Sequence, residues 1–524
     1  MGRGREPDGM ASQQDIENRV PITGALMLAT LMNTLDGTIA NVALPHIQGS
    51  VSAAQDQVTW VLTSYIIATA IMMPLSGWIS EKIGRKRMLM LSIGGFTIAS
   101  MLCGVATNLP EIVLFRILQG LAGASLMPMS QTVMLDLFPL KMLPRVMSIW
   151  SAAIMLGPIA GPTLGGWLTE NLSWRWVFFI NLPIGLAALF VLQMFMADDP
   201  GGRQRPFDVI GFVSLTLFVG AFQLMLDRGP GQDWFGSTEL WVEAGLAVLG
   251  LYLFVIQTLS ARHPFFPREL AQDGNFVGGL TVNIFVGALL FSTGAILPSF
   301  MQNLLGYSAL QSGYASVTRG LGSVLSFIAV PFLVARLGAK PTLLIGVAFS
   351  GLSLWQMAHF NLGMSSELIL LSGFIQGVGV GLMFAPISTL SYATLAPRLR
   401  PEGTILASML RSLGSSVGIS LVQASLVSQS AVGFSRLAEH VTAETSAAAL
   451  TTSWTSGSPG AVSLTPLRAQ LARQGTMLAY DTIFAWMALA VCLLVPLVLM
   501  LKRPPPPAAQ APSAEAPSAE ALSE

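Results

Sequence analysis

The segment LQGLAGASLMP at residues 118–128 recurs as IQGVGVGLMFAP at residues 375–386. Two further pairs repeat in the same order and at a similar offset of about 255 residues: ALPHIQ at 43–48 with ILPSFMQ at 296–302, and SEKIGRKRML at 80–89 with VARLGAKPTL at 334–343. Each match alone is weak, but chance is a poor explanation for three in one order. The sequence therefore predicts two related halves.

The composition is that of a protein immersed in lipid. Of the 524 residues, 52% are hydrophobic and only 10% are charged, whereas about 25% of residues are charged in an ordinary soluble domain. Apolar runs of about 20 residues recur along the chain, and each is long enough to cross a hydrocarbon core of about 30 Å. We expect about fourteen transmembrane helices, near residues 22–44, 58–79, 88–107, 111–134, 146–167, 174–196, 207–226, 240–260, 275–300, 312–335, 342–360, 367–390, 403–428 and 480–501.

Together the repeat and the spans predict an all-α integral membrane protein with two parallel six-helix halves and two helices inserted between them. A long loop on the periplasmic side is expected at 429–479. The expected parts are a cytoplasmic N-terminal segment 1–20, an N-terminal half 21–200, two linker helices 201–270, a C-terminal half 271–502 and a disordered cytoplasmic tail 503–524.

The basic residues predict the orientation in a bacterial inner membrane. Most of the 27 Lys and Arg residues fall in loops on the side that holds both termini, and the positive-inside rule makes that side cytoplasmic. The first apolar run lacks a convincing cleavage site, so it is expected to be a retained helix. Cys103 and Cys492 lie in apolar runs and are interpreted as small core residues. The net charge of zero gives no reason to expect a nucleic-acid partner.

An acid lies in the middle of the first apolar run, within LMNTLDGTIANVALP at 31–45. Placing Asp36 at the bilayer centre costs about 2.5–3.5 kcal/mol on insertion scales, so such a residue is seldom there for stability alone. The repeat-related position in the second half is Leu289, which indicates that the scaffold itself does not require the acid. We expect Asp36 to bind and release a proton in a partly dehydrated cavity. The alternative is an acid permanently paired with a cation.

The nearest candidate partner for this acid is Arg116, within EIVLFRILQGLAGA at 111–124. A buried arginine next to the cavity would hold Asp36 charged until substrate or a proton intervenes. The alternative is a purely structural ion pair or a snorkelling side chain. Two cations of the second half, Arg319 and Arg411, lie in spans without an acid and either recognise anionic groups in the cavity or satisfy backbone carbonyls.

Asn and Gln side chains in the middle of a span are further cavity candidates, because a buried amide requires a polar partner or water. The candidates are Asn33, Asn41, Gln119, Gln223 and Gln376.

The segment GWISEKIGRKRM at 77–88 predicts a tight turn with a charge latch at the cytoplasmic surface. Glu81, Arg85 and Asp136 are expected to pair in the outward-open state and to separate when the cytoplasmic side opens. The alternative is that the charges only set the topology. The latch residues are Gly77, Glu81, Gly84, Arg85, Lys86 and, at the end of the fourth span, Asp136.

The fifth span contains GPIAGPTLGGW at 157–167. Three of its glycines stand four residues apart, so they share one helix face and permit close packing. Its prolines remove backbone donors and bend the helix, which suits a helix that rocks against the opposite half. Packing without a functional role is the alternative. The residues are Gly157, Pro158, Gly161, Pro162, Gly165 and Gly166.

These motifs together resemble the fourteen-span drug:proton antiporter branch of the major facilitator superfamily, the EmrB/QacA type. The resemblance covers essentially the whole chain. It is carried by LDGTIANVALP at 35–45, GWISEKIGRK at 77–86, RILQGLAGA at 116–124, GPIAGPTLGG at 157–166, WRWVFFINLPIG at 174–185, FDVIG at 207–211 and AYDTIF at 479–484. Glu81 departs from the family pattern, which usually carries an Asp there.

The resemblance implies proton antiport with Asp36 and Arg116 in the coupling site, and it strengthens the latch and glycine-face interpretations. It also implies a periplasmic adaptor protein and an outer-membrane channel as partners. The expected activity is multidrug efflux of small amphipathic compounds, driven by the proton gradient without any other cofactor or metal. The main alternative is export of one specific metabolite or siderophore.

Other functional classes fit the sequence less well. The four histidines show no paired metal spacing, and no nucleophile motif indicates an enzyme. A sensor or receptor would explain neither Asp36 nor the repeated halves.

Overall fold

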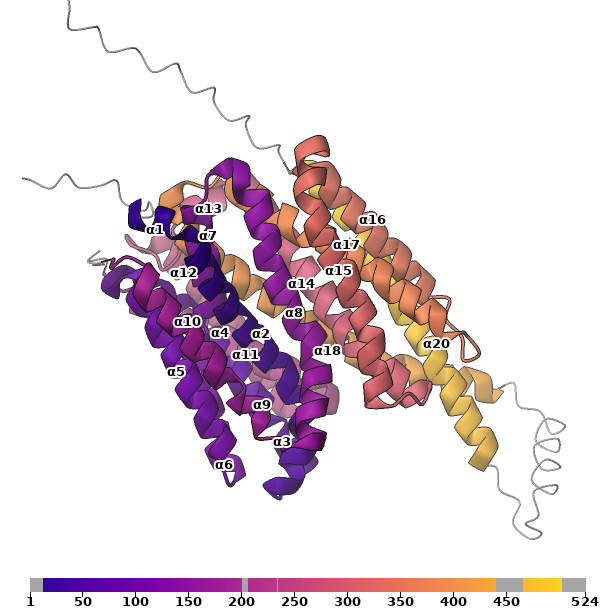
Figure 1. Cartoon of the computed structure of the whole chain (residues 1–524). Helices are drawn as coiled ribbons and strands as arrows, with labels where there is room; N and C mark the ends of the chain where they lie inside the picture. Colours follow the sequence, from indigo (N-terminus) through magenta and orange to yellow (C-terminus); the bar gives the residue numbers. More distant parts are fainter. Residues whose placement is uncertain (1–12, 200–205, 233, 440–464, 502–524) are drawn as a thin grey trace, which may run out of the picture.

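The computed structural model describes residues 13–199, 206–232, 234–439 and 465–501. Figure 1 shows the N-terminal half, in indigo to magenta, beside the C-terminal half, in orange to yellow. The N-terminal half consists of α1 (Gln13–Glu17), α2 (Arg19–Ser50), α3 (Gln55–Val58), α4 (Trp60–Ile83), α5 (Arg85–Val105), α6 (Leu109–Gly123), α7 (Leu126–Leu137), α8 (Leu143–Asn171), α9 (Trp176–Phe179) and α10 (Asn181–Phe195).

Two linker helices separate the halves, and the C-terminal half repeats the same plan. The linker helices are α11 (Val209–Arg228) and α12 (Thr238–Ser260), and a short α13 (Glu269–Gln272) follows them. The C-terminal half consists of α14 (Gly274–Ser299), α15 (Ala309–Leu337), α16 (Ala339–Met357), α17 (Ser366–Ala393), α18 (Arg400–Glu439), α20 (Thr465–Cys492) and α21 (Leu494–Met500).

The described part of the chain contains twelve helical stretches that are long and apolar enough to cross a membrane. Two more long helices, α2 and α16, pack among them against α8 and α17. Asp36 and several Thr and Asn residues lower the hydropathy of α2. With these two helices the described chain accounts for the expected fourteen, and the all-α multi-pass membrane fold is confirmed. No strand occurs among the described residues.

The internal repeat is visible in the backbone. Gly84 joins α4 to α5 with a φ of 92°, and Gly338 joins α15 to α16 with a φ of 91°. A positive φ of this kind is readily adopted only by glycine. The equivalent residues of the two repeats thus make the same turn. We call the end of the bundle that carries both turns the Gly84 end, and the opposite end the Asn108 end.

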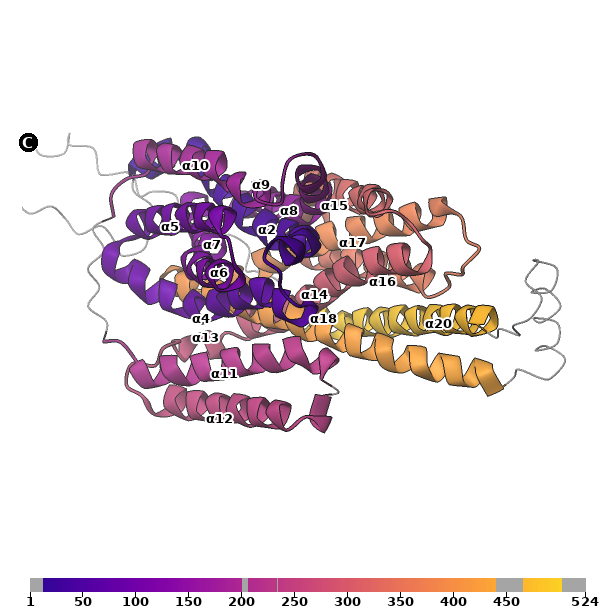
Figure 2. The ribbon, with the colours of Figure 1, turned by 90° about the horizontal axis from the view of Figure 1, so that it is seen from below.

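The linker helices lie along one side of the bundle, as Figure 2 shows. Helix α11 packs against α4 of the N-terminal half and α18 of the C-terminal half, while α12 packs on the outside of α11. In the last turn of α11, the Asp227 carboxylate accepts a hydrogen bond from the Thr63 hydroxyl. The Leu226 carbonyl accepts one from Ser420. Helix α11 therefore bridges the two halves at the Asn108 end.

The predicted loop at 429–479 is wrong over much of its length. Helix α18 continues to Glu439 and α20 begins at Thr465, so both extend beyond the apolar runs. Figures 1 and 2 show them projecting side by side. Gly433 and Gly475 allow this contact, because a Cβ on Gly433 would lie 2.8 Å from the Gly475 carbonyl oxygen. Hydropathy detects the membrane-embedded part of a helix and misses its polar continuation.

Four parts of the predicted organisation fall outside the described residues. They are the first 12 residues of the N-terminal segment, residues 201–205 and 233 of the linker region, residues 440–464 of the loop and the tail 503–524.

Candidate functional site

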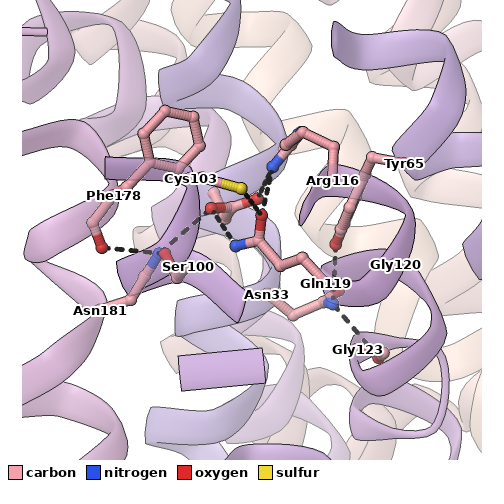
Figure 3. Close-up of polar contacts among 12 residues, drawn as sticks. Asn33, Tyr65, Ser100, Cys103, Arg116, Gln119, Gly120, Gly123, Phe178 and Asn181 are labelled. Atoms are coloured by element: carbon pink, nitrogen blue, oxygen red, sulfur yellow. Dashed lines mark hydrogen bonds and ion pairs between the residues drawn. The ribbon is translucent and has the colours of Figure 1, made fainter. Parts of the chain in front are cut away.

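A fully buried ion pair lies inside the N-terminal half. Nη1 of Arg116, on α6, is 2.6 Å from Oδ2 of Asp36, on α2. Both side chains have 0% exposure. Figure 3 shows Arg116 among the side chains that surround the pair, with Gln119, Asn181 and Tyr65. The predicted partners, 80 residues apart in sequence, are therefore in direct contact.

Two amides complete the environment of the carboxylate. Gln119 Nε2 donates to Asp36 Oδ1 over 2.8 Å, and Asn181 Nδ2 donates to the same oxygen over 3.1 Å. Gln119 Oε1 in turn accepts from Arg116 Nη1 at 2.8 Å. Asn181 Nδ2 also lies 2.9 Å from the Ser100 hydroxyl. The carboxylate thus accepts three hydrogen bonds, one from each of three side chains.

The guanidinium is also held by groups from two further helices, α4 and α9. Arg116 Nε donates to the Val61 carbonyl over 3.0 Å. The guanidinium carbon lies 4.2 Å from the centre of the Tyr65 ring and 5.7 Å from that of Phe178, within the range of cation–π attraction. Its Nη2 has no partner among the described residues. Arg116 is therefore fixed in place, with the two N–H donors of Nη2 unused.

This arrangement can respond to a single proton. A buried pair balances desolvation against Coulomb attraction, and loss of one charge leaves the other uncompensated at a cost of about 3–5 kcal/mol. Protonation of Asp36 would remove the charge that Arg116 faces. Gln119 and Asn181 would then donate to a neutral carboxyl group, whose hydrogen bonds are weaker. The site can therefore couple a proton to a rearrangement of α2 against α6.

A second charged cluster joins the halves at the Gly84 end. Asp136, on α7, is 2.7 Å from Arg85 of its own half and 3.3 Å from Arg400 of the opposite half. The Asp136 side chain is 2% exposed. Next to it, the Thr132 and Thr404 hydroxyls are 2.6 Å apart across the same junction. These contacts hold the halves together at this end.

Not all predicted latch residues take part in that cluster. Glu81 is half-buried and forms no ion pair among the described residues; it lines a small pocket with Trp78 and Glu402. Lys86 lies 3.1 Å from Asp198 instead. The prediction of the Arg85–Asp136 contact thus agrees with the structure. The prediction that Glu81 joins it does not, because Glu81 faces the linker side of α4.

Close approach of α4 and α18 explains one latch glycine. A Cβ on Gly77 would collide with the Cδ1 atom of Ile405. A larger residue at Gly77 would therefore require the Ile405 side chain of the opposite half to move.

The comparisons with known proteins agree with this architecture. The family model of the Major Facilitator Superfamily matches residues 26–419. The chain belongs to the Major Facilitator Superfamily.

Curated relatives place this member in the EmrB-type branch. The chain is 34% identical to the multidrug export protein EmrB of Haemophilus influenzae, over 80% of this chain and 83% of that protein. It is 32% identical to the fatty acid resistance protein FarB of Neisseria gonorrhoeae, over 92% and 96%. Among solved structures, human MFSD10 has a TM-score of 0.58 at 14% identity, covering 90% of this chain and 99% of that one. The last likeness supports the fold alone.

In this superfamily member, the glycine face of the fifth span packs against the helix that carries Asp36. A Cβ on Gly157 would lie 2.6 Å from the backbone carbonyl carbon of Thr34. A Cβ on Gly161 would collide with Thr38, and one on Gly165 would lie 2.7 Å from Ile39. Gly166 is different, since nothing lies within 4 Å of its Cβ position. The three predicted glycines thus bring α8 into contact with α2.

The other face of α8 meets the C-terminal half. A Cβ on Gly320 of α15 would lie 2.6 Å from Ile159, and one on Gly313 would lie 3.4 Å from Thr163. Pro158 and Pro162 lie within α8, which stays helical past both. Helix α8 therefore connects the helix of Asp36 to the opposite half.

The amide candidates separate into three groups. Gln119 belongs to the buried network, and Asn33 lies beside it, with Nδ2 3.1 Å from the Tyr65 hydroxyl. Asn41 is exposed and donates to the Gly37 carbonyl of its own helix. The other two candidates, Gln223 and Gln376, are buried in α11 and α17.

The two cations of the C-terminal half lie away from that network. Arg319 donates to the Leu290 carbonyl over 2.9 Å. Arg411 lies 2.9 Å from the sulfur of Met127 and 3.4 Å from the Ser408 hydroxyl.

Sequence reasoning missed Asn181, Ser100 and Tyr65 in the network. The signal for Asn181 was present, because it is an amide within the apolar segment WRWVFFINLPIG and the rule applied to Gln119 also applied to it. Cys103 was interpreted as a core residue. It is buried, and its thiol also lies 3.7 Å from Gln119 Oε1. No cluster of His, Cys, Asp or Glu suited to a metal ion occurs in the described part of the chain.

Proposed function

We propose that this protein exports small amphipathic compounds from the cytoplasm across a bacterial inner membrane in exchange for protons, by alternating access. The observation that carries the proposal is the fully buried Asp36–Arg116 pair with its three donors to the carboxylate. Relatives named for multidrug export and fatty acid resistance support an amphipathic cargo.

Asp36 is the proposed proton carrier and Arg116 its counter-charge. When Asp36 is protonated, Arg116 is released and α2 shifts against α6 and α8. The glycine face transmits that shift, because α8 packs on α2 on one side and on α15 on the other. One proton crossing 100 mV supplies about 2.3 kcal/mol, and we propose that no cofactor is needed besides the proton gradient.

We propose that the Gly84 end faces the cytoplasm together with both termini. The basic cluster that includes Arg85, Lys86 and Arg87 lies at this end, as the positive-inside rule expects. The Asp136–Arg400 ion pair closes this end and represents the outward-facing state. Opening toward the cytoplasm would break that pair.

The projecting ends of α18 and α20 would then lie in the periplasm. We propose that they contact a periplasmic adaptor protein, which would continue to an outer-membrane channel. The support for this is the position of the projection (Figure 1) and the resemblance to EmrB-type exporters.

The test is uptake of fluorescent amphipathic dyes, one cationic and one anionic, by inverted membrane vesicles with and without an imposed proton gradient. Gradient-dependent uptake by the native chain, lost in Asp36→Asn, is the expected result. Glu367→Gln, in the exposed first turn of α17, is a matched carboxylate control that should not change uptake. Absence of uptake of every dye would contradict multidrug export and favour a dedicated metabolite exporter.

A further inference from the structure

The C-terminal half contains two membrane-embedded cations that no acid among the described residues neutralises. Arg319 on α15 and Arg411 on α18 form no ion pair with any residue that the structure describes. In the N-terminal half, by contrast, Asp36 neutralises Arg116. A buried charge without a partner is costly in a protein interior and more so within a membrane. The two halves therefore differ by two positive charges at their cores.

The contacts of these guanidinium groups leave most of their donors without a strong acceptor. A guanidinium carries five N–H donors. Arg319 donates to one carbonyl, that of Leu290. Arg411 reaches the thioether of Met127, which is a weak acceptor, and the Ser408 hydroxyl at the long distance of 3.4 Å. Each of the two groups thus has unused capacity for an acceptor with several oxygens.

Both cations converge on one face of α14. A Cβ on Gly287 would lie 2.9 Å from Arg411 Cγ, and one on Gly294 would lie 3.4 Å from Arg319 Nη1. Leu290, which accepts from Arg319, stands between them at helical spacing. The absence of a Cβ at Gly287 and Gly294 lets both arginines pack directly against this face of α14.

The depth of the two cations in the bundle is similar. Arg319 lies about 15 Å along α15 from its start at the Asn108 end. Arg411 lies about 17 Å along α18 from its start at the Gly84 end. Both are therefore near the middle of a hydrocarbon core of about 30 Å, too deep for lipid headgroups.

Arg411 also lies on the surface where the halves meet. Its contact Met127 belongs to α7 of the opposite half. The guanidinium carbon is 5.4 Å from the centre of the Phe384 ring. That ring lies 6.4 Å from Trp150 of α8, whose buried indole N–H has no acceptor among the described residues. Unused N–H donors of Arg411 and Trp150 thus lie next to apolar side chains where the two halves meet.

The geometry points to Arg411 and Arg319 as the binding site for the anionic head of an amphipathic substrate, with its apolar part against Met127, Phe384 and Trp150. This inference rests on the proposed export function and specifies its substrate class: amphipathic carboxylates, sulfonates and phenolates. An anion with two or more oxygens accepts the unused donors and neutralises the cations. A cationic amphipath would add to the uncompensated charge.

The test is equilibrium binding to the full chain in lipid nanodiscs, with empty nanodiscs as background. The probes are two dansyl-labelled twelve-carbon amphipaths that differ only in the head group, one ending in a carboxylate and the other in a trimethylammonium. We expect the native chain to prefer the carboxylate by at least about tenfold. Arg411→Gln and Arg319→Gln should each weaken carboxylate binding about tenfold and leave trimethylammonium binding unchanged.

Two sets of control variants separate recognition from structure. Arg411→Lys and Arg319→Lys keep the charge and should recover part of the carboxylate affinity. Arg87→Gln removes an exposed cation and should change nothing. If a Gln variant does not fold, the assignment is judged from two other results. These are the preference of the native chain for the carboxylate probe and the carboxylate affinity of the Lys variants. Equal binding of both probes by the native chain, or equal loss of both in folded Gln variants, would overturn the assignment in favour of a structural role.

The outcome is independent of proton coupling, because binding is measured without a gradient. Carboxylate binding without gradient-driven uptake would contradict the proposed export and leave the site intact. Gradient-driven uptake of a cationic dye without carboxylate preference would overturn the site alone.

Discussion

Replacing Gly157 by Ala should separate the helix of Asp36 from α8. The added methyl would lie 2.6 Å from the backbone carbonyl carbon of Thr34, whereas carbon atoms pack at about 3.5–4.0 Å. The two helices must therefore move apart by about 1 Å near Asp36, since backbone atoms cannot rotate away as a flexible side chain can. Overpacking of this kind costs about 1–3 kcal/mol, partly offset by about 1 kcal/mol of improved helix propensity.

The matched control is Gly166→Ala on the same helix. Nothing lies within 4 Å of the Cβ position of Gly166, so this substitution gains only helix propensity, about 0.5–1 kcal/mol. The assay compares the unfolding midpoints of both purified variants in one detergent, and then their gradient-driven uptake in vesicles. Gly157→Ala should be less stable than the native chain and export poorly, while Gly166→Ala should match or exceed the native chain. Identical behaviour of the two variants would refute the packing argument.

Two further predictions concern the latch and the buried pair. In a background without the native cysteines, Thr132→Cys with Thr404→Cys should cross-link under mild oxidation and stop export reversibly, because their hydroxyls are 2.6 Å apart across the junction; continued export by the cross-linked protein, resolved on a gel, would show that the Gly84 end need not open. Arg116→Lys should reduce export at least about tenfold, because one ammonium cannot reach the Val61 carbonyl, Gln119 and Asp36 in the fixed geometry of the guanidinium. Native-like uptake by Arg116→Lys would show that only the charge matters.

Much of the fold was predictable because lipid imposes a simple rule on sequence. A spanning helix needs an apolar run of about 20 residues. The repeat aligned Gly84 with Gly338, and both residues make the same turn in the structure. The rule fails where a helix leaves the membrane. Residues 429–439 and 465–479 are polar enough to resemble a loop, yet they are helical because α18 and α20 support each other.

The site was predictable where a charged residue lies within an apolar run of sequence. Asp36 and Arg116 are charged residues within apolar runs, and charged residues inside a membrane usually pair with one another. Contacts between the two halves could not be predicted from charged residues within apolar runs. Arg400 pairs with Asp136 across 264 residues, and nothing in the local sequence distinguishes it from other basic residues at the same membrane face. Glu81 was assigned to the latch instead, although it faces the linker side of α4.

The central claim is that Asp36 carries the coupled proton, and substrate-induced proton release tests it most directly. Purified native protein in a weakly buffered solution with a pH indicator should release protons when an amphipathic substrate is added. Asp36→Asn, at equal substrate occupancy, should release none. Undiminished release from Asp36→Asn would show that another group carries the proton and would contradict the account.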